Sequence, residues 1–334
     1  MKKIVKRTLI TISTVAILAI SGILIFFKTN IFQTYRDLWV QTAMTTSSHQ
    51  WLATTFLSQE EIDNILANYV VTNDENSSAA LVAITDTDTD SQSATDSTTS
   101  ENTSITEISG DTYTGYVVTI KDPTTVQLIN TLNADNTGTE LSETVSENNI
   151  QVAINAAGFN FSRSRSSSAN SDANSSSGTL DSLTIIDSQL LYGDETETYP
   201  MIGLTAEGKL LLGNYTYQEA LDAGIDDAIS FSPFLIVNGN EQITETETGG
   251  YQPRTAIGQA ADGTFYFVVI EGRSTTSLGA TLYDLQEIMK NLGAVNAVNL
   301  DGGGSSELFY DGTLVNDLSN GSERSIPNAF IVTD

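Results

Sequence analysis

The pattern of hydrophobic and polar positions divides the chain into an apolar segment, a helical segment, a polar segment and a region of short strands. The apolar segment, Thr8 to Phe27, contains no charged residue and is rich in Ile, Leu, Val and Ala. A helix of that length spans the hydrocarbon core of a bilayer. We therefore expect residues 1–30 to form a cytoplasmic tip and a transmembrane signal anchor.

The charges before this segment predict its orientation. Four basic residues precede it, and they are Lys2, Lys3, Lys6 and Arg7. Basic residues stay on the cytoplasmic side, so the rest of the chain lies outside the membrane. The alternative is a cleaved signal peptide. The run ends in Phe26-Phe27-Lys28 without a small-x-small cleavage site, which favours a retained anchor.

Two further segments precede the strands. Residues 31–72 are predicted to form a helical stalk, in which Ser58 is an N-cap before Glu60 and Glu61. Residues 73–104 contain mainly Asp, Ser, Thr and Asn. Such a composition buries too little apolar surface to order itself, so this segment is interpreted as a low-complexity linker.

The region from 105 to 334 has the pattern of one domain. Its strand-like runs are Tyr113 to Ile120, Gln151 to Ile154, Leu183 to Ile186, Lys209 to Leu212, Phe234 to Val237, Thr255 to Gly258, Thr264 to Ile270 and Val295 to Leu300. Short helices are predicted at Tyr217 to Ala223 and at Leu282 to Leu292. Residues 163–178 are interpreted as a disordered surface insertion. Many strands with few helices indicate an α+β fold with mixed β-sheets.

Composition excludes several kinds of site. The chain has no cysteine and one histidine, His49, which excludes thiolate metal sites and makes a Ser-His-Asp triad untenable. The absence of cysteine also fits the surface of a Gram-positive bacterium. The formal net charge is −28, and so acidic a chain repels nucleic acid. Each arginine in this body is therefore a candidate functional residue.

One loop carries the densest set of candidate groups. Three consecutive glycines, Gly302, Gly303 and Gly304, follow Asn299 and Asp301 and precede Ser305 and Ser306. Glycines let the backbone approach a ligand closely, and an acid, hydroxyls and exposed N–H groups suit a polyhydroxylated or phosphorylated ligand. The alternative is a glycine-rich turn without function.

Other polar turns follow the strands in the same way. They are Asn155 to Asn160, Ser232 to Gly239, Arg254 to Gly258, Glu271 to Arg273 and Glu323 to Ala329. Functional groups at strand ends on a rigid scaffold are a common way to build a site. In this order the series resembles the phosphodiester glycosidase family, over roughly Ile105 to Asp334. The most specific segments are Asn299 to Ser306, Arg254 to Gly258 and the Gly272-Arg273 turn.

Two positions depart from the pattern of that family. The family usually has Asp-Gly-Arg where this chain has Glu271-Gly272-Arg273, and it usually closes the Asn155 turn with Asp where this chain has Asn160. The first change moves a carboxylate by one methylene. The second replaces a carboxylate with an amide. Both bear on substrate choice and on activity.

The resemblance implies a reaction and roles for particular residues. The reaction is hydrolysis of a sugar-1-phosphodiester, in which arginines hold the departing phosphate. The implied catalytic residues are Asp301 as nucleophile or base, Glu271 as second carboxylate, and Arg254. The implied substrate-binding residues are Asn155, Arg273, Asn299, Gly302, Gly303, Gly304, Ser305, Ser306 and Arg324. The alternative for each arginine is a structural ion pair.

The expected partner is a carbohydrate or sugar-phosphate polymer of the cell wall or exopolysaccharide. The expected location is the cell membrane, as a single-pass protein with its catalytic domain outside. No cofactor is expected, while a metal ion near Asp301 stays an open alternative. Two other functions also stay open, which are a glycan-binding module without turnover and a transferase that uses the same site. The sugar, the stereochemical outcome and the oligomeric state do not follow from the sequence.

Overall fold

The structure, a computed structural model, describes residues 2–46, 49–84, 102–133, 137–148, 150–158 and 183–333. The predicted insertion at 163–178, most of the polar part of the predicted linker and Asn160 lie outside these residues. The chain divides into two compact units. The first comprises Met1–Val70 with Glu247–Gly250, and the second comprises Val71–Thr246 with Tyr251–Asp334.

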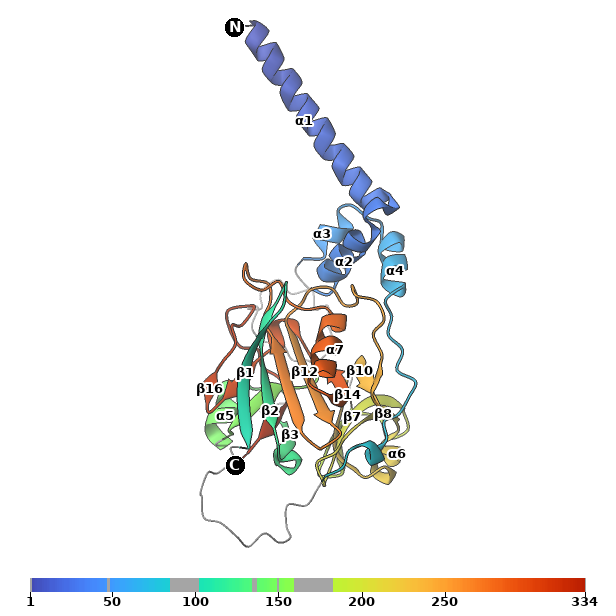
Figure 1. Cartoon of the computed structure of the whole chain (residues 1–334), viewed down its shortest axis with the longest axis vertical. Coiled ribbons are helices and arrows are strands. Elements are labelled where there is room, and N and C mark those ends of the chain that lie inside the picture. Colours follow the sequence, from blue (N-terminus) through green and yellow to red (C-terminus); the bar gives the residue numbers. More distant parts are fainter. Residues whose placement is uncertain are drawn as a thin grey trace, which may run out of the picture. The chain divides into compact units, whose positions relative to one another are not determined.

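The first unit is helical. Its elements are α1 (Lys2–Lys28), η1 (Asn30–Phe32), α2 (Gln33–Met44), α3 (Trp51–Thr54) and α4 (Gln59–Ala67) (Figure 1). Helix α1 contains one segment, Lys6–Lys28, that is long and apolar enough to cross a membrane. Helix α4 begins with the capping box that its sequence predicts, because the Ser58 and Glu61 side chains each accept from the other's backbone N–H.

The structure corrects one boundary of the predicted linker. Residues 73–84 belong to the second unit and are hydrogen-bonded to other parts of it. The Ser77 N–H donates to the Leu212 carbonyl over 2.6 Å, and Asn73 Oδ1 accepts from the Phe234 N–H over 2.8 Å. The Ala83 N–H donates to the Ala261 carbonyl. Backbone and asparagine hydrogen bonds order this segment even though it buries little apolar surface.

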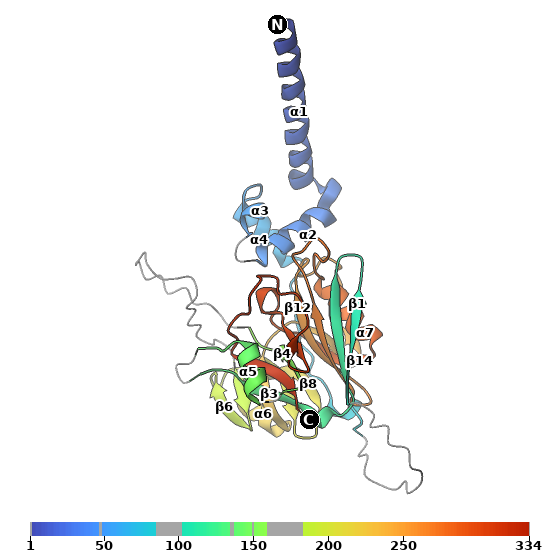
Figure 2. The same cartoon turned by 90° about the vertical axis from the view of Figure 1, so that its left-hand side faces the viewer.

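The second unit contains three antiparallel sheets (Figure 2). The largest has the strand order β1-β2-β13-β12-β14-β10-β11. Its strands are β1 (Thr103–Ser109), β2 (Thr114–Ile120), β10 (Phe234–Val237), β11 (Asn240–Glu241), β12 (Arg254–Ala260), β13 (Phe265–Ile270) and β14 (Ala294–Asn299).

Two five-stranded sheets complete the unit. One has the order β16-β15-β4-β17-β3 and the other β6-β5-β9-β7-β8. Their strands are β3 (Val126–Asn130), β4 (Val152–Asn155), β5 (Thr184–Ile186), β6 (Gln189–Tyr192), β7 (Tyr199–Thr205), β8 (Leu210–Tyr215), β9 (Ile225–Ser230), β15 (Leu308–Tyr310), β16 (Thr313–Leu314) and β17 (Asn328–Val332). The helical elements are η2 (Ala79–Leu81), η3 (Pro123–Thr125), α5 (Leu141–Asn148), α6 (Tyr217–Asp222), α7 (Leu282–Asn291) and η4 (Gly303–Ser305).

The seven-stranded sheet is covered on both faces. Along β13, Phe265, Phe267 and Val269 pack into a core shared with the two smaller sheets, whereas Val268 and Ile270 face the core beneath α7. This alternation follows from the two-residue period of a strand. The prediction of an α+β fold preceded by one apolar N-terminal helix is confirmed.

Candidate active site

Antiparallel register brings three of the predicted motifs to one edge of the seven-stranded sheet. Arg254, at the start of β12, is paired with Ile270, the last residue of β13. Ala256 on β12 is paired with Asn299, the last residue of β14. The start of β12 and the ends of β13 and β14 therefore lie side by side, and Arg254, Glu271 and Asn299 share one edge.

The neighbouring five-stranded sheet contributes the ends of three more strands. Asn155, the last residue of β4, is paired with Ala329 near the start of β17. Ile154 is paired with Leu308, the first residue of β15. The glycine loop leaves β14 in the large sheet and enters β15 in the smaller one, so it crosses between these two edges.

Each glycine of this loop is held against a neighbour that a side chain would displace. A Cβ on Gly302 would lie 2.7 Å from the Pro253 carbonyl oxygen. Gly303 has φ +65°, and a Cβ on this residue would lie 3.1 Å from Arg273 Nη2. A Cβ on Gly304 would overlap the Asn320 side chain. Gly303 and Gly304 thus let the backbone lie directly against polar side chains, and Gly302 lets it lie against another backbone segment.

Asn155 ties the loop to both sheets. Its Nδ2 donates to the Asp301 carbonyl over 2.6 Å, and its Oδ1 accepts from the Thr255 hydroxyl over 2.8 Å and from the Glu307 N–H over 3.2 Å. The residue is 1% exposed. Both polar atoms of this amide thus bind protein groups, and the geometry favours a positioning role over direct contact with a ligand.

Asp301 lies at the end of a short chain of polar contacts. The Arg324 Nη1 donates to Ser305 Oγ over 3.0 Å, and the Ser305 hydroxyl donates to the Asp301 carboxylate. Burial raises the pKa of Asp301 above its usual range, while the Ser305 hydrogen bond, the Arg324 charge and the Gly302 N–H oppose this rise. The charged form is thus partly desolvated yet supported by three donors or charges.

Three arginines lie near one another around the loop. Burial, followed by the charge of Arg324, lowers the pKa of Arg273, whose Nη2 donates to the neutral Gln252 amide over 2.8 Å. Burial lowers the pKa of Arg254 to about 10, with Asp284 opposing the shift and Arg273 adding to it. Mutual effects on pKa place Arg254, Arg273 and Arg324 in one group. Such concentrated positive charge in an acidic chain favours an anionic ligand.

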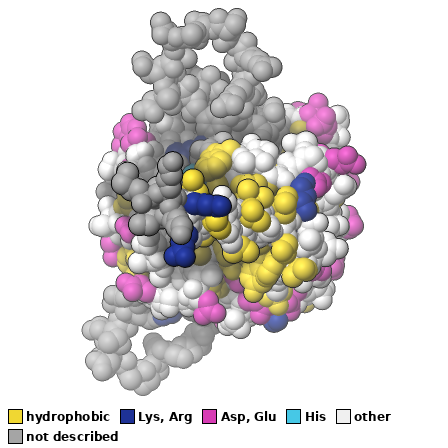
Figure 3. Space-filling view, turned by 90° about the horizontal axis from the view of Figure 1, so that it is seen from above, with side chains coloured by type: hydrophobic (Ala, Val, Ile, Leu, Met, Phe, Trp, Pro, Cys, Tyr) yellow, Lys and Arg dark blue, Asp and Glu magenta, His cyan; other side chains and the backbone are white. Residues whose placement is uncertain are grey.

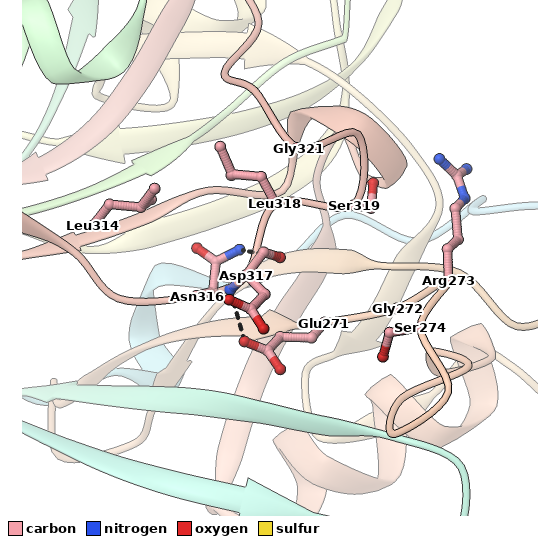
Figure 4. A pocket seen from close by; sticks show the side chains of 10 residues that line it. All are labelled: Glu271, Gly272, Arg273, Ser274, Leu314, Asn316, Asp317, Leu318, Ser319 and Gly321. Carbon is pink, nitrogen blue, oxygen red and sulfur yellow. Dashed lines mark hydrogen bonds between the residues drawn. The ribbon is translucent and has the colours of Figure 1, made fainter.

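Glu271 lines an open pocket that adjoins the loop. Its Oε1 accepts from the Asp317 N–H over 2.8 Å, and its Oε2 accepts from the Thr114 hydroxyl over 2.9 Å. The pocket has a volume of about 460 Å³. Figure 4 shows the Glu271 and Asp317 side chains together on one side and the Arg273 guanidinium on another. The pocket-lining Ser319 donates to the Gly303 carbonyl over 3.2 Å, which links this pocket to the loop.

Sequence reasoning missed Glu307, which is buried beneath the loop. Its Oε1 accepts from the Arg324 N–H over 3.2 Å, whereas its Oε2 has no hydrogen-bond partner among the described residues. Burial raises its pKa to about 8, aided by the charges of Glu323 and Glu140. The available signal was a carboxylate placed directly before the apolar Leu308-Phe309 pair at the start of a strand.

Other buried polar atoms near the loop are also unsatisfied by the described residues. They are Asn299 Oδ1, Ser306 Oγ and Asn328 Nδ2. Asn328, which the sequence analysis did not select, uses its Oδ1 to accept from the Ala157 N–H over 2.8 Å. Buried polar groups are usually hydrogen-bonded. A group of buried polar atoms without hydrogen-bond partners among the described residues is therefore typical of a site that binds a polar ligand or water.

The predicted residues therefore come together around one loop, with Glu271 in the adjoining pocket. A possible cation site lies elsewhere among the described residues. The carboxylates of Asp187, Asp226 and Asp227 approach within 4.8 Å of one another beside β5 and β9. This acidic cluster does not involve Asp301.

Comparison with known proteins gives related results. A family model described as phosphodiester glycosidase matches residues 148–333. An uncharacterized prophage-derived protein of Bacillus subtilis, YomE, is 32% identical over 117 residues, covering 34% of this chain and 18% of that protein. The mouse N-acetylglucosamine-1-phosphodiester alpha-N-acetylglucosaminidase is 31% identical over 130 residues, covering 34% of this chain and 25% of that enzyme.

The solved structures agree at the level of the fold. The catalytic domain of the zebrafish N-acetylglucosamine-1-phosphodiester alpha-N-acetylglucosaminidase, auto-inhibited by its pro-peptide, superimposes with a TM-score of 0.56. The two share 21% identity, over 73% of this chain and 87% of that domain. The matched region spans a quarter or less of the curated relatives' own length.

Proposed function

Because the chain belongs to the phosphodiester glycosidase family, we propose that it hydrolyses sugar-1-phosphodiester linkages in cell-wall or exopolysaccharide glycans at the outer face of the cell membrane. The observation that carries this proposal is the chain of contacts from Arg324 through Ser305 to Asp301. The Arg273 guanidinium lies against the neighbouring Gly303. This arrangement surrounds one partly buried backbone loop with a carboxylate and two cations.

The arginines would bind the phosphate. A phosphodiester carries a negative charge, and guanidinium groups bind phosphate oxygens through paired N–H donors. Arg273 and Arg324 lie nearest the glycines, at Gly303 and Gly304 respectively. The Nε of the buried Arg254 donates to the Ala280 carbonyl over 3.1 Å, and this residue would add its charge. The N–H groups of Asp301, Gly303 and Ser305 donate to protein carbonyls, so we assign the phosphate to the arginines rather than to the loop backbone.

Asp301 would act on the anomeric carbon, either as nucleophile or as the base that activates water. The bond between this carbon and the phosphate oxygen breaks, and its electron pair leaves with the phosphomonoester that the arginines hold. Water supplies the new hydroxyl group of the sugar. Glu271 would serve as the second carboxylate, since glycoside cleavage generally uses two around an oxocarbenium-like transition state. Asn299 and Ser306 would bind sugar hydroxyls with their unfilled polar atoms.

The membrane attachment would be permanent because the end of α1 is part of the helical unit. Phe27 is 7% exposed and stacks on Phe56, with ring centroids 4.6 Å apart. Lys28 pairs with Glu61 over 2.7 Å. Cleavage after Lys28 would remove this ring from the core, together with the ion pair. We therefore expect the intact mass of the protein purified from membranes to include residues 1–28, and a mass lacking them would show that the segment is a cleaved signal.

The activity is tested on the full-length protein in mild detergent with a panel of α- and β-linked sugar-1-phosphodiesters. The assay follows free reducing sugar and phosphomonoester together. We expect the wild type to release both, and Asp301→Asn to lose this release. Asp311→Asn is the matched control, because Asp311 is an exposed turn residue between β15 and β16 and its loss removes the same charge.

The same assay separates the competing functions. Binding of the diester without release of sugar by the folded wild type would overturn the hydrolase proposal and identify a binding module. Transfer of the sugar to an added acceptor sugar, at the expense of free sugar, would identify a transferase. Equal release by wild type and Asp301→Asn would remove Asp301 from the reaction.

A further inference from the structure

The helical unit joins the apolar span to a small core without an intervening linker. Its core contains Phe27 from α1, Val40 from α2, Ala53 from α3 and Ile62 from α4. Phe26 and Phe27 also approach the Trp39 ring edge-on, with centroids 6.5 and 6.4 Å away. The helices after the span are therefore held directly at its end rather than carried away from it by a flexible stalk.

One side of this unit exposes large apolar side chains. We call them the aromatic face, and its members are Ile31, Phe32, Tyr35, Trp39 and Trp51. Tyr35 is 67% exposed and Trp51 is 59% exposed. Tyr35 and Trp39 are four residues apart on α2 and share one side of that helix, whereas Asp37, Val40 and Gln41 are buried on the other. Trp39 Nε1 donates to the carbonyl of Leu52 over 3.3 Å, so α2 and α3, which carry Trp39 and Trp51, are in contact.

The charges near this face are already compensated. Arg36 pairs with the buried Asp37 over 2.8 Å, and Lys28 pairs with Glu61. Of the members of the face, Tyr35, Trp39 and Trp51 combine an apolar body with a phenolic hydroxyl or an indole N–H. Tryptophan and tyrosine with this character are enriched where a membrane protein meets the headgroup layer. Figure 3 views the structure from the end where α1 projects, and there hydrophobic side chains gather in one area beside basic groups.

The position of the face in the chain matches this layer. Ile31 follows Lys28, the last residue of α1, by three residues, which span at most about 10 Å when fully extended. One headgroup layer is roughly 5–8 Å thick. An exposed aromatic surface that begins this close to the end of the span cannot lie far from the lipid.

We propose that the aromatic face lies in the headgroup layer of the bilayer, with Trp39 and Trp51 as its interfacial anchors. This inference rests on the proposed anchoring by α1 and is independent of the proposed hydrolysis. It assigns to the helical stalk that the sequence predicts a second role, which is to lie against the membrane surface. A second copy of the chain is the competing occupant of the face.

The chain offers a direct probe, because its two tryptophans both belong to the aromatic face. The full-length protein is reconstituted in phosphatidylcholine vesicles whose acyl chains carry bromine at shallow or at deep positions. We expect tryptophan emission to be quenched several-fold more by the shallow than by the deep label. Trp39→Phe and Trp51→Phe, which each leave one tryptophan, should both show this preference.

The matched control places the tryptophan in the other unit. Leu191 of β6 is 42% exposed, close to the 41% of Trp39. In a variant with Trp39→Phe, Trp51→Phe and Leu191→Trp, we expect quenching by aqueous iodide and little quenching by either lipid label. Comparable quenching of this control by the shallow label would contradict a specific position of the aromatic face in the headgroup layer.

The remaining outcomes separate this inference from the proposals on which it rests. Vesicle flotation reports anchoring by α1. A protein that does not float with lipid overturns both this anchoring and the position of the aromatic face in the headgroup layer. A protein that floats but whose tryptophans respond only to iodide overturns the position of the face alone. Tryptophans shielded from iodide and both lipid labels, at high protein-to-lipid ratio only, would identify a second copy on this face. Sugar release in detergent tests the hydrolase separately.

Discussion

Ser305 accepts a hydrogen bond from Arg324 over 3.0 Å and donates its own hydroxyl proton to Asp301. One buried hydroxyl, 0% exposed, thereby fixes the orientation of both a cation and a carboxylate. The Arg324 charge also lowers the pKa of Asp301, so the cation supports the charged form of the carboxylate.

Replacing Ser305 with Ala should impair the site without unfolding the protein. The loss of a hydrogen bond to a charged group costs about 1.5–3 kcal/mol, so we expect kcat/KM for the sugar phosphodiester to fall roughly 10- to 100-fold. The pH below which activity is lost should also rise, because the pKa of Asp301 loses a lowering contribution. The exposed Ser322, replaced with Ala, is the control. Unchanged kinetics in Ser305→Ala would contradict the role given to this hydroxyl.

Replacing Gly303 with Ala should distinguish the effect of backbone strain on stability from the effect of displacing Arg273 on substrate binding. Gly303 has φ +65° and lies against Arg273, whereas Gly312 has φ +73° with no atom within 4 Å of an added Cβ. Both substitutions should cost about 1–2 kcal/mol of stability through backbone strain. Only Gly303→Ala should raise KM, because the new methyl group displaces the guanidinium.

Thermal unfolding and steady-state kinetics measured on both glycine variants provide the check. If Gly312→Ala raises KM as much as Gly303→Ala does, the effect comes from general destabilisation and Arg273 has no special place at the loop.

The buried acid Glu307 predicts how stability depends on pH. Its pKa is about 8 in the folded protein against an ordinary value of 4.5 for a glutamate, so the folded state binds the proton more tightly than the unfolded state. The stabilisation is fully present below pH 4.5 and is lost as the pH rises toward 8, with a slope of at most about 1.4 kcal/mol per pH unit. Glu307→Gln should flatten this part of the stability curve.

Chemical denaturation of both proteins between pH 5 and 8 measures this difference. The raised pKa values of Asp301 and Asp227 contribute slopes of the same sign to both proteins and cancel in the comparison. Glu147→Gln, which changes an exposed carboxylate on α5, should leave the slope unchanged. Parallel curves for wild type and Glu307→Gln would show that this carboxyl is ionised in the folded state.

Local patterns were sufficient to predict the elements that carry a strong period. Phe234–Val237 and the cores of β12, β13 and α7 occur where the sequence predicts them. Strands β9 and β17 were missed for physical reasons. Strand β9 contains Asp226 and Asp227, which break the apolar alternation, and β17 follows Pro327 in a segment that reads as a turn. Their partners on β7 and β4, which are distant in sequence, determine that they form strands.

The motifs that form the site could be predicted from the sequence, but the relative positions and contacts of their side chains could not. Register alone places Arg254 and Asn299 at one edge, and that pairing cannot be deduced from the individual motifs. The same limit explains why Asn155 was expected to contact substrate, although its amide holds Asp301 and Glu307 in place. Glu307 itself has no local signal beyond its charge, because its burial depends on packing beneath the loop.

The position of bond cleavage tests the central claim most directly. The full-length protein is allowed to hydrolyse a sugar-1-phosphodiester in water enriched in oxygen-18, and the label in each product is measured by mass spectrometry. Attack at the anomeric carbon, with Arg273 and Arg324 holding the leaving phosphate, predicts that the sugar carries the heavy oxygen and the phosphomonoester carries none. Heavy oxygen in the phosphomonoester would instead show attack at phosphorus and would contradict a glycosidase centred on Asp301.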